Sequence, residues 1–158
     1  MEMATLTTPV GPVRLIGDGE VLVGLFTGEE QGFAAEPCAT PLLQEASRQV
    51  KAYFAGELIH FDLPLRLDGT PFQRRVWDAL MTIPYGTTIS YKQLAGLVAS
   101  QAGFRAVGAA NGRNPVSIIV PCHRVIAHDG KLGGYGGGLP RKRWLLDHEA
   151  AHAGSRLI

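Results

Sequence analysis

Cys122 and His123 stand side by side in the stretch Pro121-Cys122-His123-Arg124-Val125, and they are the residues of this chain best suited to chemistry. A thiol is a weak nucleophile until it loses its proton, and a neighbouring imidazole can accept that proton. A small buried cysteine with a chance histidine neighbour would give the same pair. The pair therefore makes Cys122 a candidate nucleophile, to be judged by what surrounds it in the chain.

The other cysteine and the other histidines indicate neither a disulfide framework nor a metal site. Cys38 lies in a loop-like context and the chain has no C-x-x-C pair, which argues against a disulfide scaffold and against a thioredoxin-like redox site. Metal binding is a weak alternative. The spacing typical of zinc ligands is absent from Cys122, His123, His128 and His148, so we expect no metal.

Charge divides the chain into an acidic front part and a basic rear part. Residues 1–69 carry ten acidic side chains against four basic ones, a balance of −6. Residues 70–143 carry ten basic side chains against two acidic ones, Asp78 and Asp129, a balance of +8. An asymmetry of this size indicates a polyanionic partner for the rear part. A solvated basic surface without a partner is the alternative that charge alone leaves open.

The composition is that of a globular protein with one domain or two small ones: 158 residues, 46% hydrophobic and 18% charged. Met1-Glu2-Met3-Ala4 lacks the basic and apolar regions of a secretory signal. No apolar stretch approaches the roughly 20 residues that a membrane span needs. We therefore expect a cytoplasmic protein.

The front part, residues 1–69, is predicted to be a small α/β scaffold domain. Two short apolar runs, 13–16 and 21–26, are joined by the turn Gly17-Asp18-Gly19 and predict a small sheet. Thr40-Pro41 predicts the start of a helix, because threonine suits the N-cap and proline the first helical position. This part holds no cluster of chemically active side chains.

A strand-like stretch closes the front part. In residues 61–68 apolar side chains alternate with polar ones, which is the periodicity of a strand, and Pro64 assigns the strand to an edge. The charge balance switches just after this stretch. We therefore place a domain boundary near Asp68-Gly69 and a second domain at residues 70–158.

The rear part begins with two capping boxes, which predict helices. In Thr70-Pro71-Phe72-Gln73 and in Ser90-Tyr91-Lys92-Gln93, the first and fourth side chains can each cap the backbone of the other residue. We expect helices over 70–83, over 90–98, and from Gln101 or Ala102 to about Asn111. The second and third of these, joined by a short turn, predict a helix-turn-helix whose last helix is the recognition helix.

The third of these helices has unusually small side chains. Phe104 and Val107 can anchor it to the core, but most of the remaining surface is alanine and glycine. Glycine costs about 1 kcal/mol against alanine in a helix interior, so such a helix needs a compensating reason. Close approach to DNA is one reason, in which case Arg105 projects from a smooth surface. Close packing against another helix of the protein is the alternative.

The segment between this helix and the last one carries the candidate nucleophile. Asn114-Pro115 ends the helix. Residues 116–120, with the apolar run Ile118-Ile119-Val120, predict a strand that leads to the cysteine. Six of the twenty glycines lie at 130–138, without the spacing of a Walker or dinucleotide motif, so a flexible connector stays a possible interpretation of this loop. Pro140 opens a last helix, over 141–149.

Several separated motifs together resemble those of the O6-alkylguanine-DNA alkyltransferases, the methylated-DNA–protein-cysteine methyltransferases. The resemblance covers roughly residues 70–149 and, loosely, the front domain, and the order and spacing of the matches make it specific. They are Ile89-Ser90-Tyr91, Arg105-Ala106-Val107-Gly108, Asn114-Pro115, Pro121-Cys122-His123-Arg124-Val125, Gly134-Tyr135-Gly136-Gly137 and Leu145-Leu146-x-x-Glu149. This family implies a front α/β domain of ribonuclease-H-like topology and a mainly helical, winged-helix-like rear domain.

The resemblance also implies an activity and the residues that perform it. A methyl or small alkyl group passes from O6 of guanine in DNA to the sulfur of Cys122, once per molecule and without a cofactor. His123 deprotonates the thiol through a water molecule, Glu149 orients the imidazole, Asn114 holds the turn that presents the cysteine, and Tyr91 donates to N3 of the guanine. The resemblance also implies that the backbone carbonyls of Cys122 and Val125 bind the guanine amino group. Tyr135 and the Gly136 amide close the pocket, and Ser117 lines it.

The same resemblance implies how DNA is bound. The damaged nucleotide flips out of double-stranded DNA, Arg105 fills the vacated space, and the small-residue helix lies in the minor groove. The implied DNA-binding residues are Arg105, Ala106, Gly108, Ala109, Asn111 and Arg113. We expect a monomer without membrane association. We also expect no zinc, because ligands matching the front-domain zinc site of some relatives are missing.

Two other classes of protein stay open. A non-catalytic sensor of alkylated DNA resembles this family but replaces the acceptor cysteine, which is present here at Cys122. A cysteine hydrolase would use the same cysteine–histidine pair, and the +8 balance of residues 70–143 disfavours it.

Overall fold

The computed structural model describes residues 1–28, 36–37, 39–99, 101, 103–127, 130–133 and 138–153. The chain forms two compact units. The first consists of residues 1–68 with 115–119, and the second of residues 69–114 with 120–158. The segment 115–119, expected in the rear domain, thus belongs to the first unit.

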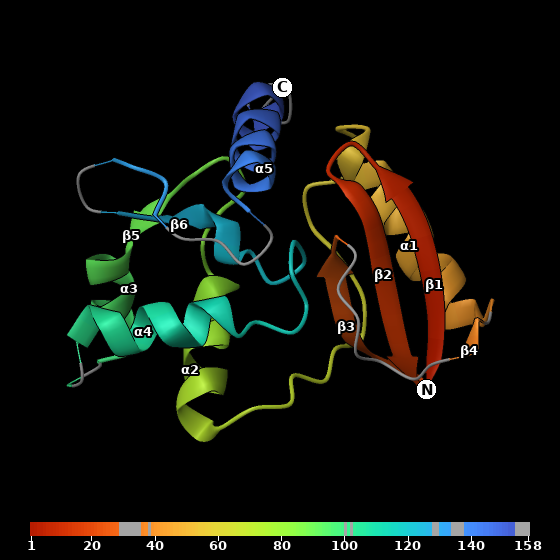
Figure 1. The fold of residues 1–158 in the computed structure, drawn as a ribbon, viewed down its shortest axis with the longest axis horizontal. Helices are drawn as coiled ribbons and strands as arrows, with labels where there is room; N and C mark the ends of the chain where they lie inside the picture. The colour runs from red at the N-terminus through yellow and green to blue at the C-terminus, as the bar shows by residue number, and fades with distance from the viewer. Residues whose placement is uncertain are drawn as a thin grey trace. The chain divides into compact units, whose positions relative to one another are not determined.

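A four-stranded sheet forms the first unit, with its strands in the order β3-β2-β1-β4 (Figure 1). β1 (Glu2–Thr8), β2 (Gly11–Asp18) and β3 (Val21–Thr27) are antiparallel neighbours, and β4 (Glu36–Pro37) pairs with β1 in parallel. β2 and β3 contain the two apolar runs from which a sheet was expected. β1 was not expected, because its threonine-rich residues form no apolar run.

Helix α1 (Pro41–Phe54) packs on β1, β2 and β3 and closes the core of the first unit. Thr40 caps the helix as expected, its hydroxyl accepting from the Leu43 N–H at 3.3 Å. The core consists of fully buried apolar side chains from both layers, including Val13, Leu15, Leu25, Leu43, Ala46 and Val50. Burial of this kind contributes roughly 1.5–3 kcal/mol for each large side chain.

Residues 61–68, predicted as an edge strand, form only a single bridge. Leu65 pairs with Leu22 of β3. Around this bridge, the Leu22 N–H donates to the Pro64 carbonyl at 2.8 Å and the Arg66 N–H donates to the Leu22 carbonyl at 3.0 Å. The apolar–polar alternation is still visible in the exposure of successive side chains. Proline has no N–H to donate, which limits a longer ladder.

Residues 116–120, also predicted as a strand, pair with β3 through an isolated bridge and do not form a strand. Val116 pairs with Leu25, and the Ser117 N–H donates to the Leu25 carbonyl at 3.1 Å. Ile118 then adopts a φ of 73°, which takes the backbone out of the extended conformation. The strand prediction is therefore wrong here, and the segment is a turn in front of the cysteine.

The second unit is mainly helical (Figure 1). Its elements in chain order are α2 (Pro71–Leu80), β5 (Ile89–Ser90), α3 (Tyr91–Leu97), α4 (Gly103–Gly112), the 3-10 turn η1 (Cys122–Arg124), β6 (Val125–Ile126) and α5 (Leu139–Ala153). The two short strands pair in parallel. An α/β unit and a mainly helical unit are the fold class expected, which is confirmed. Within the described residues, no helix is long and apolar enough to cross a membrane.

Both predicted capping boxes are formed. At α2, the Gln73 N–H donates to Thr70 Oγ1 at 3.1 Å, and the Thr70 N–H donates to Gln73 Oε1 at 3.0 Å. At α3, the Gln93 N–H donates to Ser90 Oγ at 3.0 Å, and the Ser90 N–H donates to Gln93 Oε1 at 2.7 Å. The second box fixes Tyr91 as the first residue of α3.

Helix α4 packs against α2 and α3. Trp77 of α2 donates its Nε1–H to the Ala110 carbonyl at 2.9 Å, and Val107 is fully buried. Phe104 was expected to anchor the helix as well, and this expectation is wrong, because Phe104 is 56% exposed. It lies in the first turn of α4 beside a hollow of about 380 Å³, whose described lining residues are Tyr91, Lys92, Phe104 and Ala127.

Candidate active site

Cys122 begins η1, at the end of a tightly turned segment. Ile118 has a positive φ, which β-branched residues rarely adopt and which indicates local strain. Asn114 Nδ2 donates to the Val120 carbonyl at 2.7 Å, and the Cys122 N–H donates to the same carbonyl at 2.8 Å. The Val120 carbonyl thus links Asn114 to the cysteine.

His123, the next residue, forms a buried hydrogen bond with Glu149 of α5. His123 Nε2 and Glu149 Oε2 are 2.8 Å apart, and the two side chains are 0% and 1% exposed. Arg124 binds the same carboxylate with two nitrogens, Nε at 2.7 Å from Oε1 and Nη2 at 3.0 Å from Oε2. Its Nη1 donates to the Ile83 carbonyl at 2.7 Å. The Glu149 carboxylate therefore connects α5 to two consecutive residues of η1.

These contacts set the protonation states of the pair. Burial by itself would raise the pKa of Glu149, but His123 and Arg124 outweigh it and hold that pKa well below its usual range. Burial lowers the pKa of His123, and this outweighs the opposing effect of Glu149. The imidazole is therefore neutral and donates its Nε2–H to an ionised carboxylate. Its Nδ1 then carries the lone pair, and it is buried without a hydrogen-bond partner among the described residues.

Lys142 of α5 is a buried cation near the thiol. It is fully buried, its Nζ donates to the Val125 carbonyl at 2.6 Å, and the same atom lies 5.8 Å from the centre of the Tyr91 ring. Burial lowers the pKa of Lys142 to about 8, against the opposing effect of the Cys122 charge. Lys142 is thus still mostly charged at neutral pH. By the same attraction, it favours the negatively charged form of the sulfur.

The ring of Tyr91 lies against two glycines. A Cβ at Gly133 would come within 3.0 Å of the ring, and the φ of 69° at this residue is one that other residues rarely adopt. At Gly108 a Cβ would be 3.7 Å from the ring, an ordinary contact. Burial raises the pKa of Tyr91 and the Cys122 charge raises it further, while a side-chain hydrogen bond from Asn111 lowers it in part. The phenol is therefore protonated at neutral pH and can donate a hydrogen bond.

Together these groups can activate the sulfur of Cys122 as a nucleophile. Cys122 is not part of a disulfide and is 5% exposed. It has a neutral imidazole as the next residue, a buried cation near it and a phenolic donor beside it. Among the described residues no cluster of three or more metal-ligating side chains occurs.

The two units of the chain each match a family model. Residues 1–67 match the model described as "6-O-methylguanine DNA methyltransferase, ribonuclease-like domain", and residues 71–151 match "6-O-methylguanine DNA methyltransferase, DNA binding domain". The chain belongs to the 6-O-methylguanine DNA methyltransferase family.

Individual relatives agree with this assignment. The methylated-DNA–protein-cysteine methyltransferase of Mycobacterium tuberculosis strain H37Rv is 51% identical over 152 residues, covering 94% of this chain and 92% of the relative. That of Methanosarcina acetivorans is 46% identical over 155 residues, covering 96% of this chain and 99% of the relative. A crystal structure of M. tuberculosis OGT in complex with DNA has a TM-score of 0.90 at 49% identity. The match covers 96% of this chain and 94% of the chain in that structure. The chain is thus a DNA repair methyltransferase that acts on O6-methylguanine.

Most of the residues expected to bind DNA in this family lie on the surface of α4 or just after it. Arg105, Ala109 and Arg113 are exposed, and Ala106 and Gly108 are partly exposed. Asn111 is an exception, because it is only 4% exposed. Its Nδ2 points instead to the Cys122 carbonyl, at 3.4 Å. We therefore correct its assignment from the DNA-binding surface to the interior of the active site.

The expected pocket residues are only partly placed by the structure. The Val125 carbonyl lies in the site and accepts from Lys142. Ser117 belongs to the other compact unit, and Tyr135 and Gly136 lie outside the described residues. Cys38 and His128 lie outside them as well.

Two residues of the site received no role from the sequence. Arg124 stands within the cysteine motif, and Lys142 stands within a basic run that is typical of a helix surface. A signal for Lys142 was present, because it is three residues before Leu145 and seven before Glu149. That spacing places all three on one helix face, and all three are buried.

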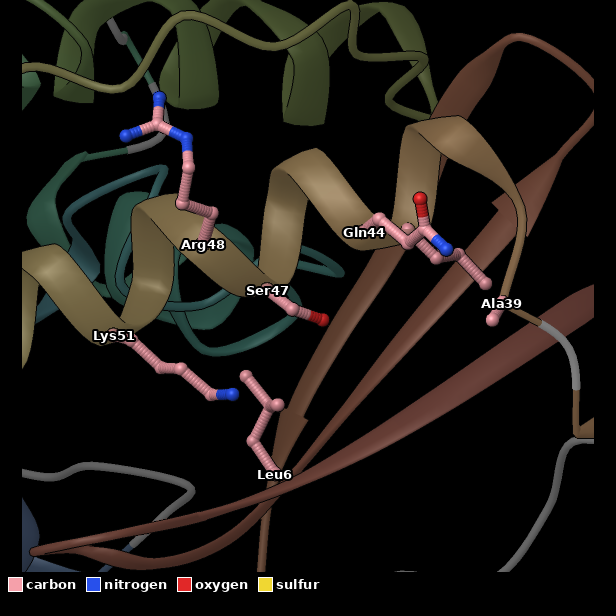
Figure 2. A pocket seen from close by; sticks show the side chains of 7 residues that line it. Leu6, Ala39, Gln44, Ser47, Arg48 and Lys51 are labelled. Carbon is pink, nitrogen blue, oxygen red and sulfur yellow. The ribbon is translucent and has the colours of Figure 1, made fainter.

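A second hollow, in the first unit, offers no comparable chemistry. It measures about 370 Å³ and lies between α1 and β1 (Figure 2). Its described lining mixes apolar, neutral polar and long basic side chains and has neither a cysteine nor a histidine: Leu6, Ala39, Leu43, Gln44, Ser47, Arg48 and Lys51. Arg48 is already paired with Glu45, its Nε 2.6 Å from Oε1.

Lys142→Met is expected to slow methyl transfer on the order of tenfold at neutral pH. A nearby positive charge lowers the pKa of a thiol by about one unit or more, and the variant loses this effect on Cys122. The loss should shrink in alkaline solution. There the thiolate forms without help, and wild-type Lys142 itself loses its charge above about pH 8. Transfer rates measured from about pH 6 to about pH 10 test this. If the ratio of the wild-type rate to the Lys142→Met rate stays constant over this range, Lys142 only holds the Val125 carbonyl.

Proposed function

We propose that Cys122 is the acceptor of a methyl or small alkyl group from O6 of guanine, and that each molecule reacts once. The observation that carries the proposal is the hydrogen bond between His123 and Glu149, which leaves His123 Nδ1 as a buried base one residue from the thiol. The substrate is double-stranded DNA with a flipped O6-alkylguanine. No cofactor takes part.

In the proposed reaction His123 Nδ1 accepts the thiol proton through a water molecule, and Glu149 stabilises the imidazolium. The thiolate attacks the alkyl carbon opposite O6, so that the sulfur–carbon bond forms as the carbon–O6 bond breaks. The electrons of that bond pass to the guanine, where Tyr91 donates to N3 and helps to disperse the charge. The guanine anion takes up a proton from the imidazolium or from solvent. A thioether is not hydrolysed under cellular conditions, so the protein is consumed.

For guanine recognition we propose Tyr91 and the backbone carbonyls of Cys122 and Val125, with Ser117, Tyr135 and Gly136 as further pocket residues. The two carbonyls are not equivalent. The Cys122 carbonyl already accepts from the Val125 N–H and from Asn111 Nδ2, and a carbonyl oxygen has two lone pairs. Its contact with Asn111 Nδ2, at 3.4 Å, is the longer and weaker one, and the amino group of the guanine can take its place.

On the DNA side, we propose that α4 lies in the minor groove as the recognition helix, and that Arg105 replaces the flipped base. The small side chains at Ala106, Gly108 and Ala109 permit close approach to the DNA backbone. The +8 balance of residues 70–143 supports a polyanionic partner. We propose a monomer that works where the DNA is, which is the cytoplasm in bacterial cells such as those of the M. tuberculosis relative.

Arg105→Ala is expected to slow transfer from O6-methylguanine in duplex DNA by roughly 10- to 100-fold and to leave transfer from free O6-methylguanine nearly unchanged. Flipping costs a few kcal/mol of stacking and pairing, and a free base does not pay it. Arg105→Lys should recover only part of the loss, because lysine lacks the planar guanidinium. The rates are compared on both substrates with protein in saturating excess.

Arg113→Ala is the matched control for this experiment. It removes an exposed positive charge from the end of the same helix, so it should weaken DNA binding without changing the rate at saturation. Equal slowing of Arg105→Ala on duplex and on free base would show that Arg105 shapes the pocket and does not replace the flipped base.

A further inference from the structure

Phe104 is an exposed aromatic residue for which the reaction described above has no use. It lies in the first turn of α4, is 56% exposed, and makes no ring contact among the described residues. Single exposed apolar side chains are common on protein surfaces and need no explanation of their own. The position of Phe104 on α4 therefore decides whether it has a role.

Phe104 lies where two sides of α4 meet. It stands seven residues before Asn111, about two helical turns, so both residues lie on the same side of the helix. That side faces the cysteine, because Asn111 Nδ2 is 3.4 Å from the Cys122 carbonyl. Arg105 is the next residue and lies on the adjoining side, which is exposed. Phe104 is thus placed between the side of α4 proposed to contact DNA and the side that faces the active site.

The hollow beside Phe104 combines an aromatic surface with positive charge. It measures about 380 Å³, and its described lining consists of Phe104, Ala127 and the first two residues of α3, Tyr91 and Lys92. Each of the two helices adds an exposed cation here. Lys92 lines the same hollow, and Arg105 follows Phe104 in the chain.

An exposed ring together with cations is the combination with which proteins bind nucleic acid. The cations interact with phosphates, and the ring packs on a base. Proteins that bind the minor groove also insert apolar side chains between neighbouring base pairs and partly unstack them. In the proposed function α4 lies in the minor groove and Arg105 replaces the flipped base. The ring of Phe104 then faces the base pair next to the flipped nucleotide.

We propose that Phe104 is an apolar wedge, whose ring packs against the base pair adjoining the flipped O6-alkylguanine and keeps the duplex open at that step. The inference rests on the proposed function, because it takes the position of the duplex from α4 and Arg105. The two residues then share the cost of opening the duplex. The Arg105 guanidinium fills the vacated space, and the Phe104 ring replaces part of the stacking that the neighbouring base pair loses.

The test measures transfer from O6-methylguanine in duplex DNA and from free O6-methylguanine, with protein in saturating excess. Phe104→Ala should slow transfer from the duplex by roughly five- to 100-fold, the effect of one contact between a base and an aromatic ring. It should leave transfer from the free base unchanged, because a free base has no neighbouring base pair. Phe104→Trp should keep the duplex rate within about twofold of wild type, and Phe104→Leu should lie between wild type and Phe104→Ala.

Met81→Ala is the matched control, because it removes another exposed apolar side chain of the same unit, at the end of α2. It should react with both substrates at the wild-type rate. Alanine favours helix at an exposed position, so Phe104→Ala is expected to fold. Sedimentation of wild type and Phe104→Ala, without DNA, accompanies the rate measurements.

Two results would overturn the wedge. Equal slowing of Phe104→Ala on the duplex and on the free base would mean that the ring shapes the pocket. An unchanged duplex rate would mean that the ring does not contact DNA, and a change in oligomeric state in the same variant would assign it to a contact with a second copy of the chain. A wild-type protein that takes a methyl group from neither substrate would instead overturn the proposed function on which this inference rests.

Discussion

Cys122→Ala is expected to abolish methyl transfer completely and to leave the affinity for duplex DNA within about twofold of wild type. The first effect follows because no other atom of the site can take the role of the sulfur. The second follows because Cys122 is 5% exposed, whereas Arg105 and Arg113 are exposed. Transfer of a labelled methyl group and electrophoretic binding at fixed salt measure the two effects separately.

Cys38→Ala is the matched control, because it removes the other cysteine of the chain. It should transfer the methyl group at the wild-type rate. Transfer by Cys122→Ala would mean that another residue is the acceptor. A wild-type protein that binds O6-methylguanine DNA without transferring the methyl group would behave as a non-catalytic lesion sensor, the alternative that the sequence left open.

Glu149→Gln is expected to damage the fold and the chemistry together. The free energy of unfolding should fall by about 3–5 kcal/mol at neutral pH, because the Arg124 guanidinium, 7% exposed, is left buried without its counter-charge. Methyl transfer should slow by about 100-fold or more, because a neutral amide does not stabilise the imidazolium that forms on His123. Urea denaturation and single-turnover transfer rates measure the two effects.

The stability difference between wild type and Glu149→Gln should also depend on pH. The folded pKa of Glu149 is lowered from its ordinary 4.5, so its contribution is fully present above that pH and is lost as the pH falls towards the folded value. His123 is present in both proteins, so the comparison is made below pH 4.5, where only wild type loses the contribution of Glu149. Wild type should therefore lose more stability on acidification than Glu149→Gln. Parallel loss in both proteins would contradict this.

Two further variants separate structure from chemistry at Glu149. Asp147→Asn removes an exposed carboxylate from the same helix and should change stability by no more than about 0.5 kcal/mol. Arg124→Met combined with Glu149→Met removes both buried charges and should regain much of the stability lost in Glu149→Gln, because no unpaired charge remains. It should nevertheless stay as slow in transfer as Glu149→Gln. If it regained activity, the carboxylate would serve only the fold.

Local signals predicted the helices of the second unit well. The capping boxes at Thr70 and Ser90 formed as expected, because the groups that make them lie within four residues of one another. The strands were harder, because pairing depends on distant partners. Residues 61–68 have the right alternation, but their neighbour is β3 and they form only one bridge with it, at Leu65.

The active site shows the same division between local and tertiary information. The cysteine motif and Glu149 could be assigned from resemblance. The burial of Asn111 could not, because it arises from contacts with Cys122 and Tyr91, which are distant along the chain. The prediction that Phe104 anchors α4 to the core was wrong for the opposite reason. Its apolar side chain suggested the core, but nothing in the described residues covers it.

The central claim is that Cys122 takes up one alkyl group and keeps it. Intact-protein mass spectrometry after mixing the protein with increasing amounts of O6-methylguanine duplex tests this claim most directly. The expected result is a mass increase of one methyl group that stops at one per protein, located on Cys122 by peptide mapping and absent from Cys38. Continued demethylation of many equivalents of DNA by one equivalent of protein, or a methyl group on any other residue, would contradict the account.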